Sequence, residues 1–365
     1  MGRIKVLASI EWFTPAYQAG GIISSFLNQT HHLSPNVEFW IVCGNRDLIG
    51  NQPVSQIENE WLPFEAHHVR YSSGTIPWSS ILGDIQPAHV YVHGLFNGPF
   101  CRELIQNAHR WHVPMTVASH GMLAPAALAI KPIRKKAWLL AQRFRGTLNA
   151  ITWHASSSVE AQQIQLQLPD AQVRIAANLP PFKSEAGKKD STKWTFVSVG
   201  RIHPIKNYPF AARVLQNVAH RTGADIVYRI IGPEEDAAEV QRLRTDAPNG
   251  IRLSLDGPLP PSQLSTAYQS AHALLVPSLT ENYGQVVAEA LAHGLPVFVS
   301  DQTPWTSTPV SAALTCLPLE PNTWSNSLVD FIQAWDSEIS NAAHSLFDEH
   351  VLQPDLVEAQ RKLFP

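Results

Sequence analysis

The sequence has few cysteines, a low net charge and no long apolar run, and each shortage excludes a class of protein. Its three cysteines are scattered and odd in number, so they form neither a disulfide framework nor a zinc-ligand spacing: Cys43, Cys101 and Cys316. A reducing, cytoplasmic setting is therefore expected. No stretch approaches the roughly 20 apolar residues that span a bilayer. The apolar segment 4–10 is too short for a signal peptide and is expected to form a first buried strand.

The charge balance excludes another class of partner. The net charge is only −3, which gives no sign of binding to nucleic acid. Histidines number sixteen, yet neighbours such as His67 and His68 lack Cys, Asp or Glu at metal-ligand spacing, so we interpret them as surface and structural residues. A composition with 44% hydrophobic residues is that of a soluble globular protein, and 365 residues suit about two domains.

Common nucleotide-binding motifs are also missing. The sequence contains no Gly-x-Gly-x-x-Gly and no phosphate loop ending in Gly-Lys-Ser/Thr, which argues against a dehydrogenase or a P-loop enzyme. It contains no Asp-x-Asp pair either, so a metal-bridged diphosphate has no obvious ligands. We therefore expect neither a bound cofactor nor a metal.

What the sequence does contain is a series of short runs rich in Val and Ile, separated by segments of helix length. Such runs are typical of buried parallel strands in βαβ units. They fall at residues 6–10, 37–43, 89–92, 115–118 and 151–154, and again at 195–199, 226–231, 251–255, 273–276 and 296–299. The pattern predicts an α/β protein with two doubly wound, Rossmann-like parallel-sheet domains.

Residues 178–193 separate the two series of strands. Their content of Pro, Gly, Lys, Ser and Asp is typical of an interdomain linker. The expected division is an N-terminal domain at 1–177, a second domain at 194–323 and a polar helical tail at 324–365. Two such domains bind ligands in a cleft at the facing carboxyl ends of their strands.

The strongest local signal lies at residues 278–291. A strand ends near Ser278, a turn with Gly284 follows, and a helix rich in Ala and Val begins near Gln285. Free N–H groups and the dipole at a helix start suit a diphosphate. Glu281 and Glu289 can each accept hydrogen bonds from vicinal hydroxyls of a sugar or a ribose. By spacing alone, a capping carboxylate and a solvated helix residue explain them equally well.

A cationic loop precedes this segment in the sequence. Arg201 and Lys206 follow a buried strand and precede a helix that is expected to start at Asn207. Two cations at the carboxyl end of a strand can neutralise a pyrophosphate leaving group. Ordinary surface residues are the alternative, which the anion-binding helix start in the same domain makes less attractive.

The first half offers shorter motifs at the ends of its strands. Gly20 and Gly21 lie between the first strand and the first helix, where paired glycines allow the backbone to approach a ligand or simply make a tight turn. His120 follows another strand end, although a lone histidine is more often structural.

One stretch of the first half, residues 131–145, is strongly basic and contains no acid. Trp138, Leu139, Leu140 and Phe144 are interleaved with its cations, which are Lys131, Arg134, Lys135, Lys136, Arg143 and Arg145. A basic amphipathic helix of this kind can lie on an anionic membrane surface. A helix packed on the core with a solvated basic edge explains it as well.

Taken together, these motifs resemble the retaining glycosyltransferase family 4, also called glycosyl transferases group 1, whose members adopt the GT-B fold. The resemblance is densest between residues 194 and 305, and the two glutamates with seven residues between them are its signature. The motifs follow the family's order: Gly200-Arg201 with Lys206, Asp256-Gly257-Pro258-Leu259, residues 277–289, Gly294-Leu295-Pro296-Val297 and Thr303-Pro304-Trp305. In the first half, Gly20-Gly21 and His120-Gly121-Met122 are similar to family positions but are shorter and less specific.

The resemblance implies a role for each candidate residue. Arg201 and Lys206 would hold the donor diphosphate, and Glu289 the nucleotide ribose. Glu281, with the backbone of Asn282, Tyr283 and Gly284, would hold the donor sugar. Gln285 and Val286 would offer N–H groups to the phosphates, Gly20 and Gly21 would approach them from the other domain, and His120 would contact the sugar near its reacting carbon. The catalytic candidates are His120, Glu281, Arg201 and Lys206.

The implied activity is metal-independent transfer of a sugar from a UDP- or GDP-sugar, with retention of configuration. The acceptor would be a glycan or a lipid-linked molecule, as in the synthesis of surface polysaccharide, and the enzyme would be cytoplasmic, at most peripheral at the inner face of the cell membrane. A nucleotide-sugar 2-epimerase of the same fold and a non-catalytic partner subunit are the alternatives. Asn282-Tyr283 replaces the family's frequent Gly-Phe, and the Gly/Trp-rich turn after Trp305 is missing.

Overall fold

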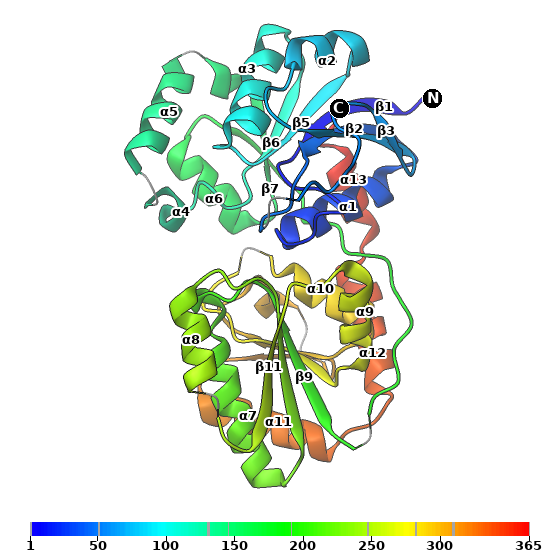
Figure 1. The fold of residues 1–365 in the computed structure, drawn as a ribbon, viewed down its shortest axis with the longest axis vertical. Helices are drawn as coiled ribbons and strands as arrows, with labels where there is room; N and C mark the ends of the chain where they lie inside the picture. The colour runs from blue at the N-terminus through cyan, green and yellow to red at the C-terminus, as the bar shows by residue number, and fades with distance from the viewer. Residues whose placement is uncertain are drawn as a thin grey trace. The chain divides into compact units, whose positions relative to one another are not determined.

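The chain divides into two compact units. The structure is a computed structural model that describes residues 2–49, 52–129, 132–144, 146–190, 192–246, 248–281, 283–308 and 311–364. The first unit comprises Met1–Leu179 with Pro354–Pro365, and the second comprises Pro180–Gln353 (Figure 1).

The first unit is built on an eight-stranded sheet with the order β3-β4-β2-β1-β5-β6-β7-β8. Neighbouring strands run parallel except for β3, which pairs antiparallel with β4. The strands are β1 (Ile4–Ser9), β2 (Val37–Gly44), β3 (Leu62–Phe64), β4 (His67–Ser72), β5 (His89–His93), β6 (Met115–Ala118), β7 (Ile151–Ala155) and β8 (Gln172–Ile175). The helical elements are α1 (Gly21–Leu33), α2 (Trp78–Ile85), η1 (Gly98–Arg102), α3 (Glu103–Arg110), α4 (Pro125–Ala129), α5 (Pro132–Phe144), η2 (Thr147–Ala150), α6 (Ser158–Gln167) and α13 (Pro354–Arg361).

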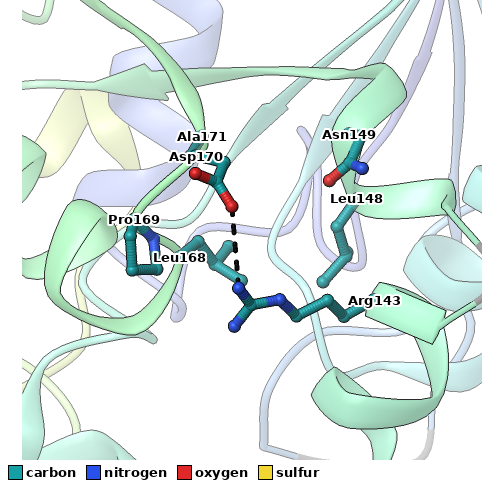
Figure 2. Close-up of a pocket in the computed structure, with 7 residues that line it drawn as sticks. All are labelled: Arg143, Leu148, Asn149, Leu168, Pro169, Asp170 and Ala171. Atoms are coloured by element: carbon teal, nitrogen blue, oxygen red, sulfur yellow. Dashed lines mark ion pairs between the residues drawn. The ribbon is translucent and has the colours of Figure 1, made fainter.

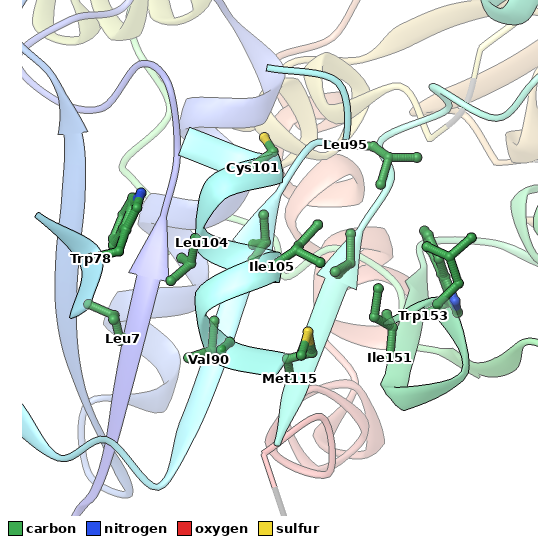
Figure 3. Packing of buried hydrophobic residues seen from close by; sticks show 14 of the residues in the cluster. Leu7, Trp78, Val90, Leu95, Cys101, Leu104, Ile105, Met115, Ile151 and Trp153 are labelled. Carbon is green, nitrogen blue, oxygen red and sulfur yellow. The ribbon is translucent and has the colours of Figure 1, made fainter. Parts of the chain in front are cut away.

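Both faces of this sheet are buried, because alternate residues of a strand point to opposite sides. Val90 belongs to the same buried cluster as Trp78, Ile105 and Trp153, which Figure 3 draws. Tyr91, the next residue of β5, belongs instead to the cluster on the other face. Strands covered on both faces are continuous apolar runs, which explains why they are visible in the sequence.

The second unit contains a six-stranded parallel sheet with the order β11-β10-β9-β12-β13-β14. Its strands are β9 (Trp194–Val199), β10 (Ile226–Ile231), β11 (Ile251–Gly257), β12 (Ala273–Val276), β13 (Val297–Ser300) and β14 (Leu314–Leu317). Its helical elements are η3 (Pro204–Lys206), α7 (Tyr208–Thr222), α8 (Ala237–Thr245), α9 (Pro261–Ser270), α10 (Gln285–Ala292), η4 (Pro304–Ser307), α11 (Pro321–Gln333), α12 (Ile339–Leu346) and η5 (Phe347–Val351).

The ten predicted strands are confirmed, each within two residues of its expected bounds. The sequence did not indicate β3, β4, β8 and β14. β3 and β8 are partly exposed edge strands, and polar residues alternate with apolar ones in β4, so the apolar signal is weak in all three. β14 is an edge strand of the second sheet and has only four residues.

The C-terminal segment is placed differently from the separate tail that we expected. α11 and α12 lie in the second unit, where Trp324 is fully buried against Phe210. The last residues belong to the first unit: Phe364 is fully buried, and the Leu363 carbonyl accepts a hydrogen bond of 3.0 Å from Thr116 Oγ1 on β6. The segment thus completes both cores, because a minority of large apolar residues within a polar sequence supplies the contacts.

The burial of Trp324 yields a stability prediction. Trp324→Ala removes a fully buried ring and its indole N–H bond of 2.9 Å to the Pro318 carbonyl. We expect the free energy of unfolding of the second unit to fall by about 3–5 kcal/mol, measured by urea denaturation. Asn322→Ala, at an exposed position of the same helix, should change it by less than about 0.5 kcal/mol. Equal effects of the two substitutions would contradict the placement of α11 in the core.

Candidate functional site

The order of strands in the second unit reverses between β9 and β12. The chain passes from β9 to β10 and β11 on one side and then returns to β12 on the other side. In open parallel sheets, ligands bind at the carboxyl ends of the strands where such a reversal occurs. The segment with Arg201 and Lys206 follows β9, and the segment with Glu281 follows β12. The two strongest sequence signals therefore meet at this point.

An ion pair joins the two segments. Lys206 Nζ lies 2.5 Å from Glu281 Oε1, and Ser278 Oγ donates a 2.7 Å hydrogen bond to the same oxygen. The side chains of Lys206 and Glu281 are only 17% and 12% exposed, so solvent screens the pair weakly. A backbone bond of 2.8 Å from Leu279 N to the Ile205 carbonyl fastens the two loops together. Both residues were candidates from the sequence, which gave no sign that they pair.

Two glycines make room for this arrangement. Gly200, with φ of +143°, lies where a Cβ would come within 3.4 Å of Lys206 Cε and 3.0 Å of the Tyr208 hydroxyl. At Gly232, after β10, a Cβ would lie 2.1 Å from the Gly200 carbonyl oxygen. Real Cβ atoms do not approach a backbone oxygen as closely as 2.1 Å, and a φ of +143° is one that side chains rarely adopt, so both positions favour glycine. They let Lys206 fold back over the end of β9.

Arg201 points to a different partner. Its guanidinium forms an ion pair with Glu235, and both side chains are nearly half exposed. An ion pair of that exposure contributes little to stability, so an incoming anion can open it at small cost. The β9 and β10 ends are also linked by a 2.8 Å bond from Ile202 N to the Pro233 carbonyl. The structure brings Lys206 and Glu281 together and leaves Arg201 paired with Glu235, which the sequence did not single out as its partner.

The helix start that was predicted near Gln285 is confirmed by α10. Gly284 is its N-terminal flanking residue in the left-handed region, with φ of 79° and ψ of 55°. Trp305 Nε1 donates a 2.6 Å hydrogen bond to the Tyr283 carbonyl, and a Cβ at Gly284 would lie 3.0 Å from that nitrogen. The indole thus fixes the turn that orients the first N–H groups of α10, including that of Val286. Asn282 lies outside the described residues.

Glu289 lies one turn inside α10 and is held by a tyrosine. Tyr268 donates a 2.8 Å hydrogen bond from its hydroxyl to Glu289 Oε2. Burial raises the pKa of Tyr268, and the carboxylate of Glu289 raises it further, so the phenol stays protonated and remains a donor. Tyr268 carries no sequence signal for this role, because it lies 21 positions away on α9.

In the first unit, the predicted glycines form the start of α1. Gly20 precedes the helix with φ of 66° and ψ of −130°, and Gly21 is its first residue. Asp47, which follows β2, accepts hydrogen bonds from Tyr17 N and Gln18 N at 3.0 and 3.1 Å and so fixes the preceding loop. A single Asp in a polar loop gives no sign in the sequence that it accepts these hydrogen bonds.

His120 is part of a buried network centred on an acid that the sequence pattern did not identify. Glu160 accepts hydrogen bonds from Gly121 N at 2.7 Å and from Ser119 Oγ at 2.8 Å, on either side of His120. Its other oxygen accepts from Ser156 N and Oγ at 2.9 and 2.8 Å. On the other side, His120 Nε2 lies 3.0 Å from His93 Nδ1. The pattern Ser157-x-x-Glu160 signals a helix start, and these residues do begin α6. The pattern gives no sign that Glu160 also holds the backbone that follows β6.

Burial and hydrogen bonding set the protonation states of His120 and Glu160 in this network. Burial lowers the pKa of His120 to about 4, although Glu160 opposes that shift, so the imidazole is neutral near pH 7. Burial by itself would raise the pKa of Glu160, but the hydrogen bonds from Ser156 and Gly121 and the nearby His120 leave it below its usual value. The site therefore combines a neutral imidazole with a fixed carboxylate, which suits a hydroxyl partner better than an anion.

A pocket elsewhere among the described residues lies apart from the predicted site residues. A small pocket between the end of α5 and the turn before β8 is lined by none of the predicted site residues: Arg143, Leu148, Asn149, Leu168, Pro169, Asp170 and Ala171 line it (Figure 2). Within the described ranges, no group of three or more His, Cys, Asp or Glu side chains is placed to hold a metal ion. Nor does any described helix have the length and apolarity to cross a membrane.

Comparison with known proteins finds sequence similarity in the second unit. Residues 181–335 match the family model described as "Glycosyl transferases group 1". D-inositol 3-phosphate glycosyltransferase of Nocardia farcinica is 31% identical over 109 residues, which are 28% of this chain and 24% of that protein. The enzyme of the same name from Corynebacterium diphtheriae is 34% identical over 105 residues, 27% of this chain and 24% of that protein. These matches span about a quarter of the curated relatives.

The fold of the whole chain is shared with solved structures. Sucrose-phosphate synthase from Thermosynechococcus elongatus superposes with a TM-score of 0.70 over 100% of this chain and 98% of that one, at 12% identity. Anabaena Alr3699/HepE, solved with UDP and glucose, has a TM-score of 0.64 at 13% identity, covering 99% and 98% of the two chains. The predicted GT-B fold is thereby confirmed. Assignment to family 4 within group 1 stays a prediction.

The buried histidines of the first unit yield a pH prediction. Burial lowers the pKa of His89, as it does that of His120, to about 4. Below about pH 6.5 the unfolded chain binds protons that the folded chain refuses, so stability must fall as the pH drops. We expect the free energy of unfolding, measured in urea, to decrease from pH 6.5 to 5 by up to about 1.4 kcal/mol per pH unit for each such histidine.

A single substitution separates this cause from general acid sensitivity. His89→Gln removes one of these histidines at a position outside the candidate site, and the pH dependence should decrease by about one proton. An unchanged slope in the variant, or a flat profile in the wild type, would contradict the neutral burial of His89.

Proposed function

We propose that the chain is a retaining glycosyltransferase that moves a sugar from a UDP- or GDP-sugar to a glycan or lipid-linked acceptor. The group 1 domain match and the shared fold support transfer of a sugar. Surface polysaccharide synthesis is the role we propose for the product, and a metal ion is not part of the reaction. The nucleotide sugar is a co-substrate, so no cofactor is required.

One observation carries the proposal: a helix start and a lysine are held together where the strand order of the second sheet reverses. The N–H groups of Gln285 and Val286 stand at the positive end of the α10 dipole. Lys206 is held by its contact with Glu281, in the segment that leads directly to that helix. A diphosphate fits this combination, because N–H groups and a cation both stabilise its negative charge.

The proposed chemistry follows from this electrostatic arrangement. As the bond between the anomeric carbon and the diphosphate oxygen breaks, negative charge grows on the departing phosphate, where Lys206, Arg201 and the α10 N–H groups stabilise it. The acceptor hydroxyl attacks from the same face, and its proton passes to the departing phosphate. No enzymic nucleophile is needed, and the protein's contribution is alignment together with stabilisation of the leaving group.

The remaining residues of the second unit are assigned to the sugar and the nucleoside. We assign Glu281, with the backbone of Asn282, Tyr283 and Gly284, to the donor sugar. Glu289 is assigned to the ribose, where Tyr268 holds its carboxylate in one orientation. Carboxylates accept hydrogen bonds from two vicinal hydroxyls, so both assignments suit their chemistry.

The first unit supplies the remaining contacts in this proposal. Gly20 and Gly21 approach the diphosphate with backbone only, since neither has a side chain to obstruct it. His120, neutral near pH 7, forms a hydrogen bond with a sugar hydroxyl near the reacting carbon. Glu160 is the positioning residue for His120, because it holds the backbone on both sides of it.

A nucleotide-sugar 2-epimerase and a non-catalytic subunit remain as alternative functions. An epimerase would convert the donor into its C2 epimer without an acceptor, and a non-catalytic subunit would bind the donor without turnover. An acceptor panel decides among them, and the names of the curated relatives justify including an inositol phosphate. Formation of a glycosylated product supports the proposal. Appearance of the C2-inverted sugar in the absence of every acceptor would favour the epimerase.

Substitution of Lys206 tests the diphosphate assignment. We expect Lys206→Ala to weaken UDP binding about 10- to 100-fold, the loss typical of one charge-assisted hydrogen bond, measured by isothermal titration calorimetry. Lys188→Ala removes an exposed lysine of the same unit and should leave the affinity unchanged.

A second variant guards against misfolding, since Lys206→Ala leaves the mostly buried Glu281 without its cation. Lys206→Ala combined with Glu281→Gln removes both charges and should restore thermal stability but not UDP affinity. Wild-type affinity in the double variant would remove Lys206 from the donor site.

A further inference from the structure

The outer face of α5 is apolar although it faces solvent. Ile133, Leu140 and Phe144 are 83%, 55% and 91% exposed. They are spaced seven and four residues apart, so they lie on one side of the helix, together with the exposed Ala137 and Ala141. A surface helix normally buries such a stripe. Here the stripe extends along all 13 residues of α5, about 20 Å.

Contacts on the opposite face of α5 fix its orientation. Leu139 and Gln142 are buried, and Trp138 packs against Phe96 with ring centroids 5.8 Å apart. Lys135 Nζ donates a 2.6 Å hydrogen bond to the Ala127 carbonyl and lies 5.0 Å from the centre of the Phe96 ring. These contacts hold the helix with its apolar stripe outward. In Figure 1, α5 lies at the margin of the first unit.

The stripe is bordered by positive charge. Arg134 and Lys136 are exposed beside it, and the helix contains no acidic residue from Pro132 to Phe144. Arg143, at the end of the helix, lies 3.6 Å from Asp170 and is partly neutralised (Figure 2). Lys135 is turned inward by its contacts with Ala127 and Phe96. Lys131 and Arg145, which belong to the same basic stretch of the sequence, lie outside the described residues.

We propose that this face of α5, defined by Ile133, Leu140, Phe144, Arg134 and Lys136, docks the first unit on an anionic lipid bilayer. Apolar side chains at helical spacing enter the boundary between headgroups and acyl chains, and cations beside them meet the phosphates of the headgroups. α5 alone supplies both the apolar side chains and the cations. The transfer chemistry proposed above does not depend on it.

A second copy of the chain is a poorer occupant of the same face. In a twofold dimer the same patch meets itself, which would place Arg134 and Lys136 against their own counterparts without an acid on α5 to neutralise them. An anionic bilayer complements both the charge and the apolar stripe. The charges therefore favour a lipid surface.

Vesicle co-sedimentation of the full-length chain tests this proposal. Wild-type protein should bind vesicles of equal parts phosphatidylglycerol and phosphatidylcholine, and should bind pure phosphatidylcholine vesicles much more weakly. Arg134→Gln with Lys136→Gln should weaken binding about 30-fold, because each cation near an anionic surface contributes about a factor of five. Lys188→Gln with Arg213→Gln changes the charge equally at exposed positions of the second unit and should have little effect.

A second pair of variants tests the apolar stripe. Leu140→Ser with Phe144→Ser should weaken binding at least about tenfold. Leu166→Ser with Phe182→Ser, at positions that are 71% and 57% exposed elsewhere, is the matched control. All four positions are exposed, so thermal stability should be unchanged.

The outcomes are distinct from one another. Binding lost with either α5 pair but kept in both controls supports the proposal. No binding by wild type, equal binding by wild type and the α5 variants, or equal binding to neutral and anionic vesicles would overturn it. A lipid-free dimer, seen by analytical ultracentrifugation, that dissociates on Leu140→Ser with Phe144→Ser would also overturn it, in favour of a second copy. The α5 substitutions should leave the affinity for UDP unchanged, so the donor assignment is tested separately.

Discussion

The ion pair between Lys206 and Glu281 is the contact on which the arrangement of the second unit's site depends. It joins the loops after two neighbouring parallel strands, at the place where the direction of strand addition reverses. Because the pair is mostly buried, breaking it without a substitute for either charge is costly. A ligand that engages the pair must therefore offer an anion to the lysine and hydrogen-bond donors to the carboxylate. A nucleotide sugar offers both, in its diphosphate and in its sugar hydroxyls.

The surrounding residues keep these groups in position. Gly200 and Gly232 allow the close backbone approach that Lys206 requires. Trp305 fixes the turn before α10, and Tyr268 fixes Glu289. The first unit follows the same plan, since Glu160 fixes the backbone around His120. The residues that we propose contact the donor are thus held in place by other residues that would not contact it. Such preorganisation lowers the cost of aligning a substrate.

The sequence allowed the buried strands and the α10 start to be predicted, because both depend on local patterns. Apolar runs such as 273–276 report burial on both faces of a parallel sheet, and Gly284 before an Ala-rich segment reports a helix start. Edge strands such as β8 lack that pattern. The supporting residues could not be predicted in this way: Glu160 and Tyr268 act over 39 and 21 positions, through contacts that only the folded chain creates. The resemblance to a known family, rather than spacing, selected Glu281 and Glu289 over ordinary helix residues.

The central claim is that the start of α10 and Lys206 bind a nucleoside diphosphate. Titration of 15N-labelled protein with UDP, followed through the amide resonances of Gly284, Gln285 and Val286, tests it most directly. The account predicts large, saturable downfield shifts at these amides, because a phosphate would accept hydrogen bonds from them, with little change at the amides of α8. Saturable UDP binding that leaves the α10 amides unmoved would contradict the account, since the diphosphate would then be bound elsewhere.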